Sequence, residues 1–262
     1  MRAAWHQSAF LPIAGLLTGT AWIVLWLWAA SPYGRYLDHG SWLQTGVAGA
    51  ICRSLPAGEA LLPGLLYVGG WLLMSAAMML PTTLPLLEIF RRTTAARSDR
   101  HRLLLLLIAG YLVVWGAFGV IAHLADLGVQ AVVLQSPWLT FNAWAVGAGV
   151  LATAGLFQFS ALKYRCLEQC RTPFSFVVRH WGSERPAWRS FRLGAHHGLY
   201  CVGCCWALMV LMFVIGTGSV GWMLLLGAVM AVEKNLPWGR RLSAPLGIAL
   251  LASASWIVLL QV

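Results

Sequence analysis

The stretch from Gly194 to Met212 concentrates side chains that bind soft metal ions. Its sequence, GAHHGLYCVGCCWALMVLM, holds two histidines, three cysteines and two methionines within an apolar run. Because residues three, four, seven and eight apart share one face of a helix, the second histidine and all three cysteines fall on one stripe. Imidazole, thiolate and thioether groups are the ligands that Cu(I) and Zn(II) prefer. We therefore predict a metal site whose first ligands are Cys201, Cys204 and Cys205.

Two more pairs of soft ligands extend this predicted site. Cys166 and Cys170 lie four residues apart, hence on one face if the helix before them continues. Met74 and Met78 have the same spacing within an earlier apolar run, where packing in the core is the simpler role for methionine. The full set of predicted metal ligands is Cys201, Cys204, Cys205, His197, Cys166, Cys170, His196, Met74 and Met78.

Charged residues at the ends of apolar runs are predicted to support the site. Glu88 closes one such run, and Glu233 with Lys234 closes another. A carboxylate near a membrane is costly enough to indicate a functional role. We expect Glu233 to pair with Lys234 and to support the ligands or handle protons.

Cu(I) is the metal that the site favours, because it needs only two or three soft ligands and methionines surround the cysteines. Zinc is the alternative: four thiolates from Cys166, Cys170, Cys201 and Cys204 would complete a tetrahedral structural site. Cys201-x-x-Cys204 also matches a redox dithiol, although a pair facing the cytoplasm would be kept reduced. The sequence contains no haem-attachment motif, zinc-protease motif or phosphate-binding glycine loop.

The composition is typical of membrane proteins. Of 262 residues, 60% are hydrophobic and 10% are charged, whereas a soluble domain carries roughly 25% charged residues. The net charge of +10 does not indicate nucleic-acid binding, because the basic residues lie in loops between apolar runs.

These runs predict an all-α, polytopic transmembrane helix bundle that forms one integral-membrane domain over residues 1–262. A run of about 20 apolar residues crosses the bilayer as a helix that satisfies its own backbone hydrogen bonds. Pro81 and Pro85 are expected to kink or interrupt the second span, since proline removes a backbone donor. Seven spans are expected, at about 10–30, 64–90, 103–125, 141–162, 195–216, 220–232 and 244–260.

The basic residues also predict the orientation. Sixteen lie in the N-terminal tail and in the loops after the second, fourth and sixth spans, and two lie in loops on the other side. By the positive-inside rule the N-terminus is cytoplasmic and the C-terminus outside, which puts the predicted site near the cytoplasmic face. Lys163, Arg165 and Arg171 are expected to serve topology and to contact lipid headgroups.

Four stretches resemble an uncharacterised bacterial family described as predicted metal-binding integral membrane proteins, a domain of unknown function. They extend from the second span to the sixth and cover about two thirds of the chain. The resemblance implies a polytopic membrane protein with a metal role, sometimes phrased as copper handling. The matching stretches are Met74–Thr82, Lys163–Pro173, Gly198–Met209 and Met230–Lys234.

Together these observations predict a multi-pass protein of the bacterial inner membrane that binds Cu(I) and delivers, inserts or transports it. Its expected partners are the lipid bilayer and a metallochaperone or a subunit of a membrane complex, with no nucleic acid. One alternative is a structural subunit in which a metal staples helices together. The other is a membrane thiol-redox or metal-dependent oxidase-type enzyme, although the sequence favours a protein that is not an enzyme and indicates no catalytic residue.

Overall fold

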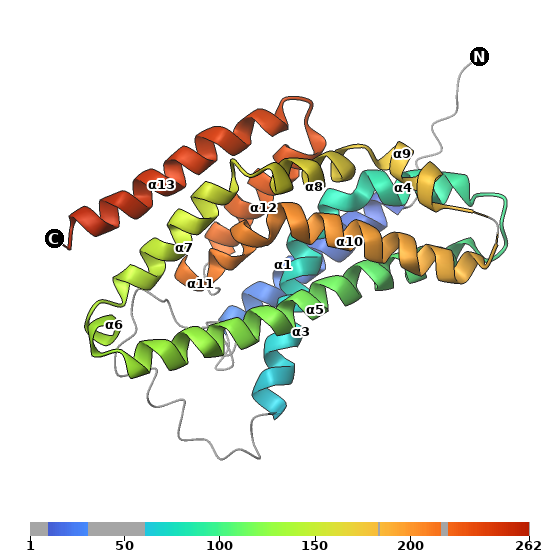
Figure 1. Ribbon diagram of the computed structural model, residues 1–262. Coiled ribbons are helices and arrows are strands. Elements are labelled where there is room, and N and C mark those ends of the chain that lie inside the picture. The colour runs from blue at the N-terminus through green and yellow to red at the C-terminus, as the bar shows by residue number, and fades with distance from the viewer. Residues whose placement is uncertain (1–9, 31–60, 183, 216–219, 262) are drawn as a thin grey trace.

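The computed structural model describes residues 10–30, 61–182, 184–215 and 220–261, and over these ranges the chain is all-helical, as predicted (Figure 1). Most of the predicted loop between the first two spans lies outside the described residues. The elements are α1 Phe10–Ala29, α3 Leu61–Met79, η3 Pro81–Thr83, α4 Leu84–Thr93, α5 Arg100–Gln135, α6 Pro137–Phe141, α7 Trp144–Phe157, α8 Ala161–Arg171, α9 Pro173–His180, α10 Pro186–Val210, α11 Met212–Ile215, α12 Val220–Asn235, η4 Gly239–Leu242 and α13 Ser243–Leu259.

Two bends interrupt the helices. The chain bends by 43° between α3 and the η3–α4 segment, where Pro81 opens the 3-10 turn and Pro85 lies in the first turn of α4. This confirms the predicted interruption. A second bend, of 63°, separates α7 from α8, where the sequence predicted one continuous helix over 141–162. The hydroxyl of Ser160 accepts a hydrogen bond from the backbone N–H of Lys163 and so begins a new helix, α8.

Helix α5 is longer than predicted. The sequence predicted a span over about 103–125, followed by a loop. In the structure the carboxylate of Asp126 is buried and accepts a hydrogen bond from Gln130 at 2.9 Å, one turn further along. This pair lets the helix continue to Gln135, where Ser136 and Pro137 end it and open α6.

Helices α5 and α10 lie side by side and pack closely against each other (Figure 1). A Cβ atom on Gly110 would lie 2.1 Å from the carbonyl oxygen of Phe191, and one on Gly194 would lie 1.9 Å from that of Leu107. Only glycine permits this approach of two backbones, which is the way small residues join membrane helices. The approach fixes the register of α10 and, with it, the direction in which its cysteines face.

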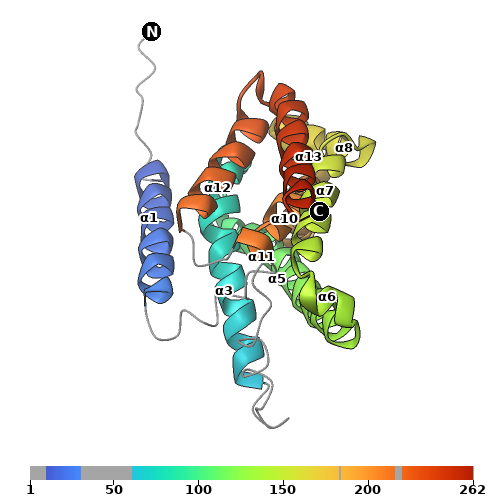
Figure 2. The same cartoon turned by 90° about the vertical axis from the view of Figure 1, so that its left-hand side faces the viewer.

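The outer surface of the bundle is apolar. Exposed leucine, isoleucine and tryptophan side chains run along α5 and α13, among them Leu105, Ile121 and Trp256. Within the described residues, three helices are long and apolar enough to cross a membrane, or up to five if each bent pair counts as one span. Helix α1 stands beside α3 at the edge of the bundle (Figure 2). The count of seven spans and the orientation stay predictions.

Candidate metal site

The three cysteines of α10 face the interior, at the level where α8, α5 and α12 meet this helix. Cys201, Cys204 and Cys205 are each at most 1% exposed. They belong to one core cluster that also contains all seven methionines of the described residues, Met74, Met78, Met79, Met209, Met212, Met223 and Met230. The predicted thiol stripe is therefore buried and lies in a sulfur-rich core.

Helix α8 places its cysteines against this stripe. The Sγ atom of Cys170 lies 4.0 Å from that of Cys204, which in turn lies 3.4 Å from the Sγ atom of Cys205. Cys166 packs against Gly203, where a Cβ atom would lie only 2.6 Å from its sulfur. Glycine at 203 thus allows α8 to come close enough for Cys170 to reach Cys204. All five described cysteines are free.

Cys201 has polar partners of its own. Lys234 of α12 donates a hydrogen bond from Nζ to the Cys201 sulfur at 2.8 Å, and the hydroxyl of Tyr111 lies 3.0 Å from the same sulfur. Lys234 also donates to the hydroxyl of Thr82 at 3.3 Å and lies 3.8 Å from the thioether sulfur of Met79. The sulfur of Cys201 is therefore engaged by side chains from two other helices, α5 and α12.

His197 lies one turn before Cys201 on the same face. Its ring stacks on that of Tyr111, with the ring centroids 6.0 Å apart. It also packs edge-to-face with the ring of Phe176, and these centroids lie 5.5 Å apart. The imidazole is buried, and its Nδ1 atom has no hydrogen-bond partner among the residues that the structure describes. Buried polar atoms without a partner are uncommon, so this nitrogen is available as an acceptor or as a ligand.

The remaining predicted residues take other partners. Met74 and Met78 are buried in the core cluster, but the thioether that Lys234 contacts, at 3.8 Å, is that of Met79, which was not among the predicted ligands. His196 lies at a distinct surface cavity, where it contacts Arg192 and His180. Glu88 accepts from Arg91 and Arg92 on its own helix at 2.7 Å.

Glu233 does not pair with Lys234, and that part of the prediction is wrong. Its carboxylate accepts from Lys163 of α8 at 2.7 Å and from Ser243 at 2.6 Å. Lys163 is completely buried and also donates to the side-chain oxygen of Gln158. Because this amine lies inside the bundle, the prediction that Lys163 contacts lipid headgroups is wrong as well. The pair joins α8 to α12.

A few residues of the site had no usable signal in the sequence. Tyr111 reads as one more aromatic residue in an apolar run, and only the contact between α5 and α10 brings it to Cys201. Arg171 donates to the backbone oxygens of Glu233 and Pro237. Its position in a basic stretch gave no indication of these contacts. The position of Lys163 could have indicated its partner type, because a lysine near the end of an apolar run is expected to pair with a carboxylate inside the bundle.

Within the described part of the chain, no three His, Cys, Asp or Glu side chains are arranged to hold one metal ion together. Two thiolates can, however, share one ion across the interface of α8 and α10. With metal–sulfur bonds of about 2.3 Å, the two sulfurs stand at most about 4.6 Å apart, in a linear arrangement. The 4.0 Å between Cys170 and Cys204 fits a bent two-thiolate site, with Cys205 next to it.

Comparison with protein-family models matches residues 68–257 to the PpoB2 family, which is described as copper chaperone. The matched range covers more than half of the chain and contains every predicted ligand. No curated protein and no solved structure matches the chain.

Proposed function

The chain belongs to the PpoB2 family of copper chaperones, and from this premise we propose that it is a membrane-embedded protein that carries Cu(I) between α8 and α10. Its location is a bacterial inner membrane, with the N-terminus and the thiol site towards the cytoplasm. It takes copper from, or passes it to, a metallochaperone or a subunit of a membrane complex. The extensive exposed apolar surface supports the membrane location.

One observation carries this proposal: the sulfur atoms of Cys170 and Cys204 lie 4.0 Å apart, although the two residues are 34 positions apart in the sequence and belong to different helices. Two soft ligands at this distance suit Cu(I), which binds well to few thiolates. Cys205 supplies a third sulfur 3.4 Å from Cys204. Cu(I) is the cargo here and binds without a rigid four-ligand cage, which suits a protein that must also release it.

The burial of the sulfurs gives the site a direction. Cys170 is half-buried, whereas Cys204, Cys205 and Cys201 are buried. Copper therefore meets Cys170 first and moves inwards to Cys204 and Cys205. The sulfur of Cys201 is engaged separately, because it accepts from Lys234, whose Nζ atom also lies 3.8 Å from the Met79 thioether.

A zinc ion held by Cys166, Cys170, Cys201 and Cys204 suits the geometry less well. Cys166 packs against Gly203, and the sulfur of Cys201 is engaged by Lys234 and Tyr111. A tetrahedral zinc site needs all four thiolates arranged around one ion. The proposed function is therefore metal transfer and not the stapling of helices.

The experiment is a copper measurement on full-length protein purified anaerobically in mild detergent and loaded with Cu(I). We expect about one copper per chain in the wild type, transferable to a thiol chelator, and loss of that copper in the Cys170→Ser/Cys204→Ser variant. Cys52→Ser is the matched control, because the sequence gives Cys52 no role. Unchanged copper in the double variant would overturn the proposal, and one zinc that does not exchange would favour the structural alternative.

A further inference from the structure

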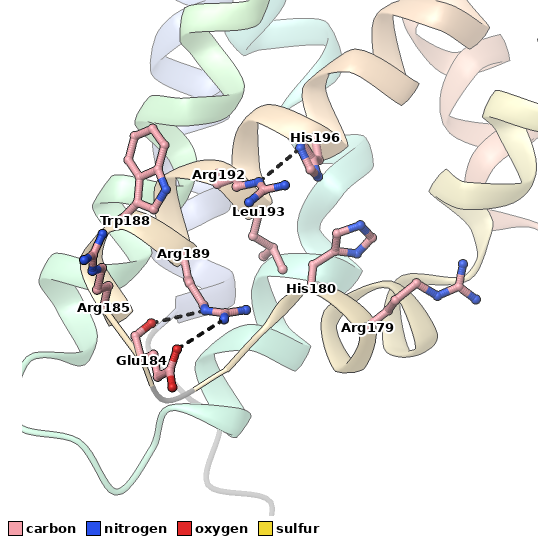
Figure 3. A pocket seen from close by; sticks show the side chains of 9 residues that line it. All are labelled: Arg179, His180, Glu184, Arg185, Trp188, Arg189, Arg192, Leu193 and His196. Atoms are coloured by element: carbon pink, nitrogen blue, oxygen red, sulfur yellow. Dashed lines mark hydrogen bonds and ion pairs between the residues drawn. The ribbon is translucent and has the colours of Figure 1, made fainter.

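A second cavity lies outside the copper region, between α9 and the beginning of α10. It encloses about 420 Å³ and is lined mainly by basic side chains. Figure 3 shows the side chains of Arg189, His180 and Leu193 near its centre, with Arg179 and Arg185 at opposite ends. No residue of the proposed copper pair takes part in this cavity.

The positive charge of the cavity is not balanced by the described residues that line it. Four arginines line it, and Glu184 is the one carboxylate among the lining residues, so three positive charges remain in excess with the histidines neutral. Glu184 is itself a weak partner, since its carboxylate is 88% exposed and lies 4.0 Å from Arg189. Arg192 directs its Nε atom towards the ring of His196 at 3.5 Å (Figure 3). The guanidinium groups of Arg189 and Arg192 both line the cavity (Figure 3), and guanidinium groups are suited to bind phosphate oxygens.

The surroundings of the cavity resemble a membrane interface. Phe174 and Val178 lie four residues apart on α9 and are 68% and 64% exposed, and Trp188 at the cavity is 59% exposed. Exposed aromatic and apolar side chains next to arginines are typical of the headgroup level of a bilayer. Basic pockets between membrane helices on the cytoplasmic side bind the headgroups of anionic lipids.

We propose that this cavity binds a phosphate group, carried by the headgroup of an anionic phospholipid. Arg189 and Arg192 are the central ligands, and Arg179 and Arg185 close the ends. The apolar side chains of α9 and Trp188 contact the lipid next to its headgroup. The phosphate site does not depend on copper; only its lipid source relies on the proposed membrane location.

The test is native mass spectrometry of delipidated, full-length protein in detergent, titrated with phosphatidylglycerol or with phosphatidylcholine. We expect phosphatidylglycerol to bind at least about tenfold more tightly, since its phosphate charge is not neutralised by choline. In the Arg189→Gln/Arg192→Gln variant its affinity should fall roughly thirtyfold, the effect of two arginines near a headgroup. Glu184→Gln should strengthen binding, because it removes the carboxylate that competes for Arg189.

Arg100→Gln/Arg102→Gln is the matched control, because both arginines are exposed at the start of α5 and do not line the cavity. It should keep the wild-type affinity within about threefold, because exposed charges act weakly at a distance. An equal loss in both double variants would overturn the proposal, since it would indicate general surface charge. Thermal unfolding of each variant establishes that it is folded.

Inorganic phosphate distinguishes the two sources of the group. If phosphate binds with the same dependence on Arg189 and Arg192 and phosphatidylglycerol does not, the site is supported but its ligand is soluble. Absence of binding by both phosphate and phosphatidylglycerol would overturn the proposal. Either result leaves the copper proposal intact, because the variants do not touch Cys170 or Cys204.

Discussion

The sulfur of Cys201 lies 2.8 Å from the ammonium nitrogen of Lys234, in the core of the bundle. Glu233, the residue before Lys234, forms an ion pair with Lys163 in which Nζ and Oε1 lie 2.7 Å apart. Two neighbouring residues of α12 therefore form polar contacts with two different helices, one with the thiols of α10 and one with α8. This arrangement ties the cysteine-bearing helices α8 and α10 to the same helix, α12.

Lys234→Gln should destabilise the protein, because the Cys201 sulfur loses its charged donor. A hydrogen bond to a charged group contributes about 1.5–3 kcal/mol, so the thermal unfolding midpoint in detergent should fall. A double-mutant cycle with Cys201→Ser measures the coupling directly. We expect the two changes to couple by about 1 kcal/mol or more; additive effects would contradict the contact.

Glu233→Gln should be more damaging, since it leaves the completely buried amine of Lys163 without a counter-ion. Removing one partner of a buried ion pair costs about 3–5 kcal/mol. Replacing both partners, Lys163→Met with Glu233→Leu, should recover a large part of this loss. The measurement is chemical or thermal unfolding of the three proteins.

Glu88→Gln serves as the control for that series, because its partner Arg92 is 75% exposed. Exposed pairs of this kind contribute about 0–1 kcal/mol. A loss as large as that of Glu233→Gln would argue that the unfolding assay reports total charge and not the buried pair.

Gly194→Ala should prevent the close packing of α5 and α10. The added Cβ would lie 1.9 Å from the carbonyl oxygen of Leu107, so the helices must separate. Overpacking of this kind costs about 1–3 kcal/mol. Gly149→Ala is the matched control, as nothing lies within 4 Å of the added atom; it should leave the unfolding midpoint unchanged or raise it slightly. Equal effects of the two substitutions would contradict the packing.

The two cysteines of α8 should differ in their effect on copper. Cys170→Ser removes a proposed ligand, so the Cu(I) affinity measured by competition with a chelator should fall. Loss of a group that only hydrogen-bonds to a metal ligand lowers the affinity roughly 10–100-fold, and loss of the ligand itself should lower it further. Cys166→Ser should cost less than about tenfold, because its sulfur packs against Gly203. The reverse order would move the proposed site one turn along α8.

The sequence predicted the all-helical class and the proline interruption near Pro81 because both depend on local properties of the chain. Helical spacing alone also predicted that Cys201, Cys204 and Cys205 share one stripe, and the structure shows that this stripe is buried. The sequence prediction failed at α5, which continues to Gln135, ten residues past the predicted end of the span, with a hydrogen bond between Asp126 and Gln130 in the added part.

The partners of the charged residues could not be predicted, because they depend on which helices touch. Glu233 and Lys234 are adjacent in the chain but point to different neighbours, and Lys163 lies 70 residues from the carboxylate that it contacts. The same applies to the meeting of Cys170 with Cys204. Spacing placed each thiol on a face of its own helix, and only the packing of α8 on α10 brings the two faces together.

X-ray absorption at the copper edge of the Cu(I)-loaded protein tests the central claim most directly. Two or three sulfur ligands at a metal–thiolate distance are predicted for the wild type, and that sulfur shell should disappear in Cys170→Ser/Cys204→Ser. A shell of nitrogen or oxygen alone would contradict the proposed site, as would a sulfur shell that is unchanged in the double variant.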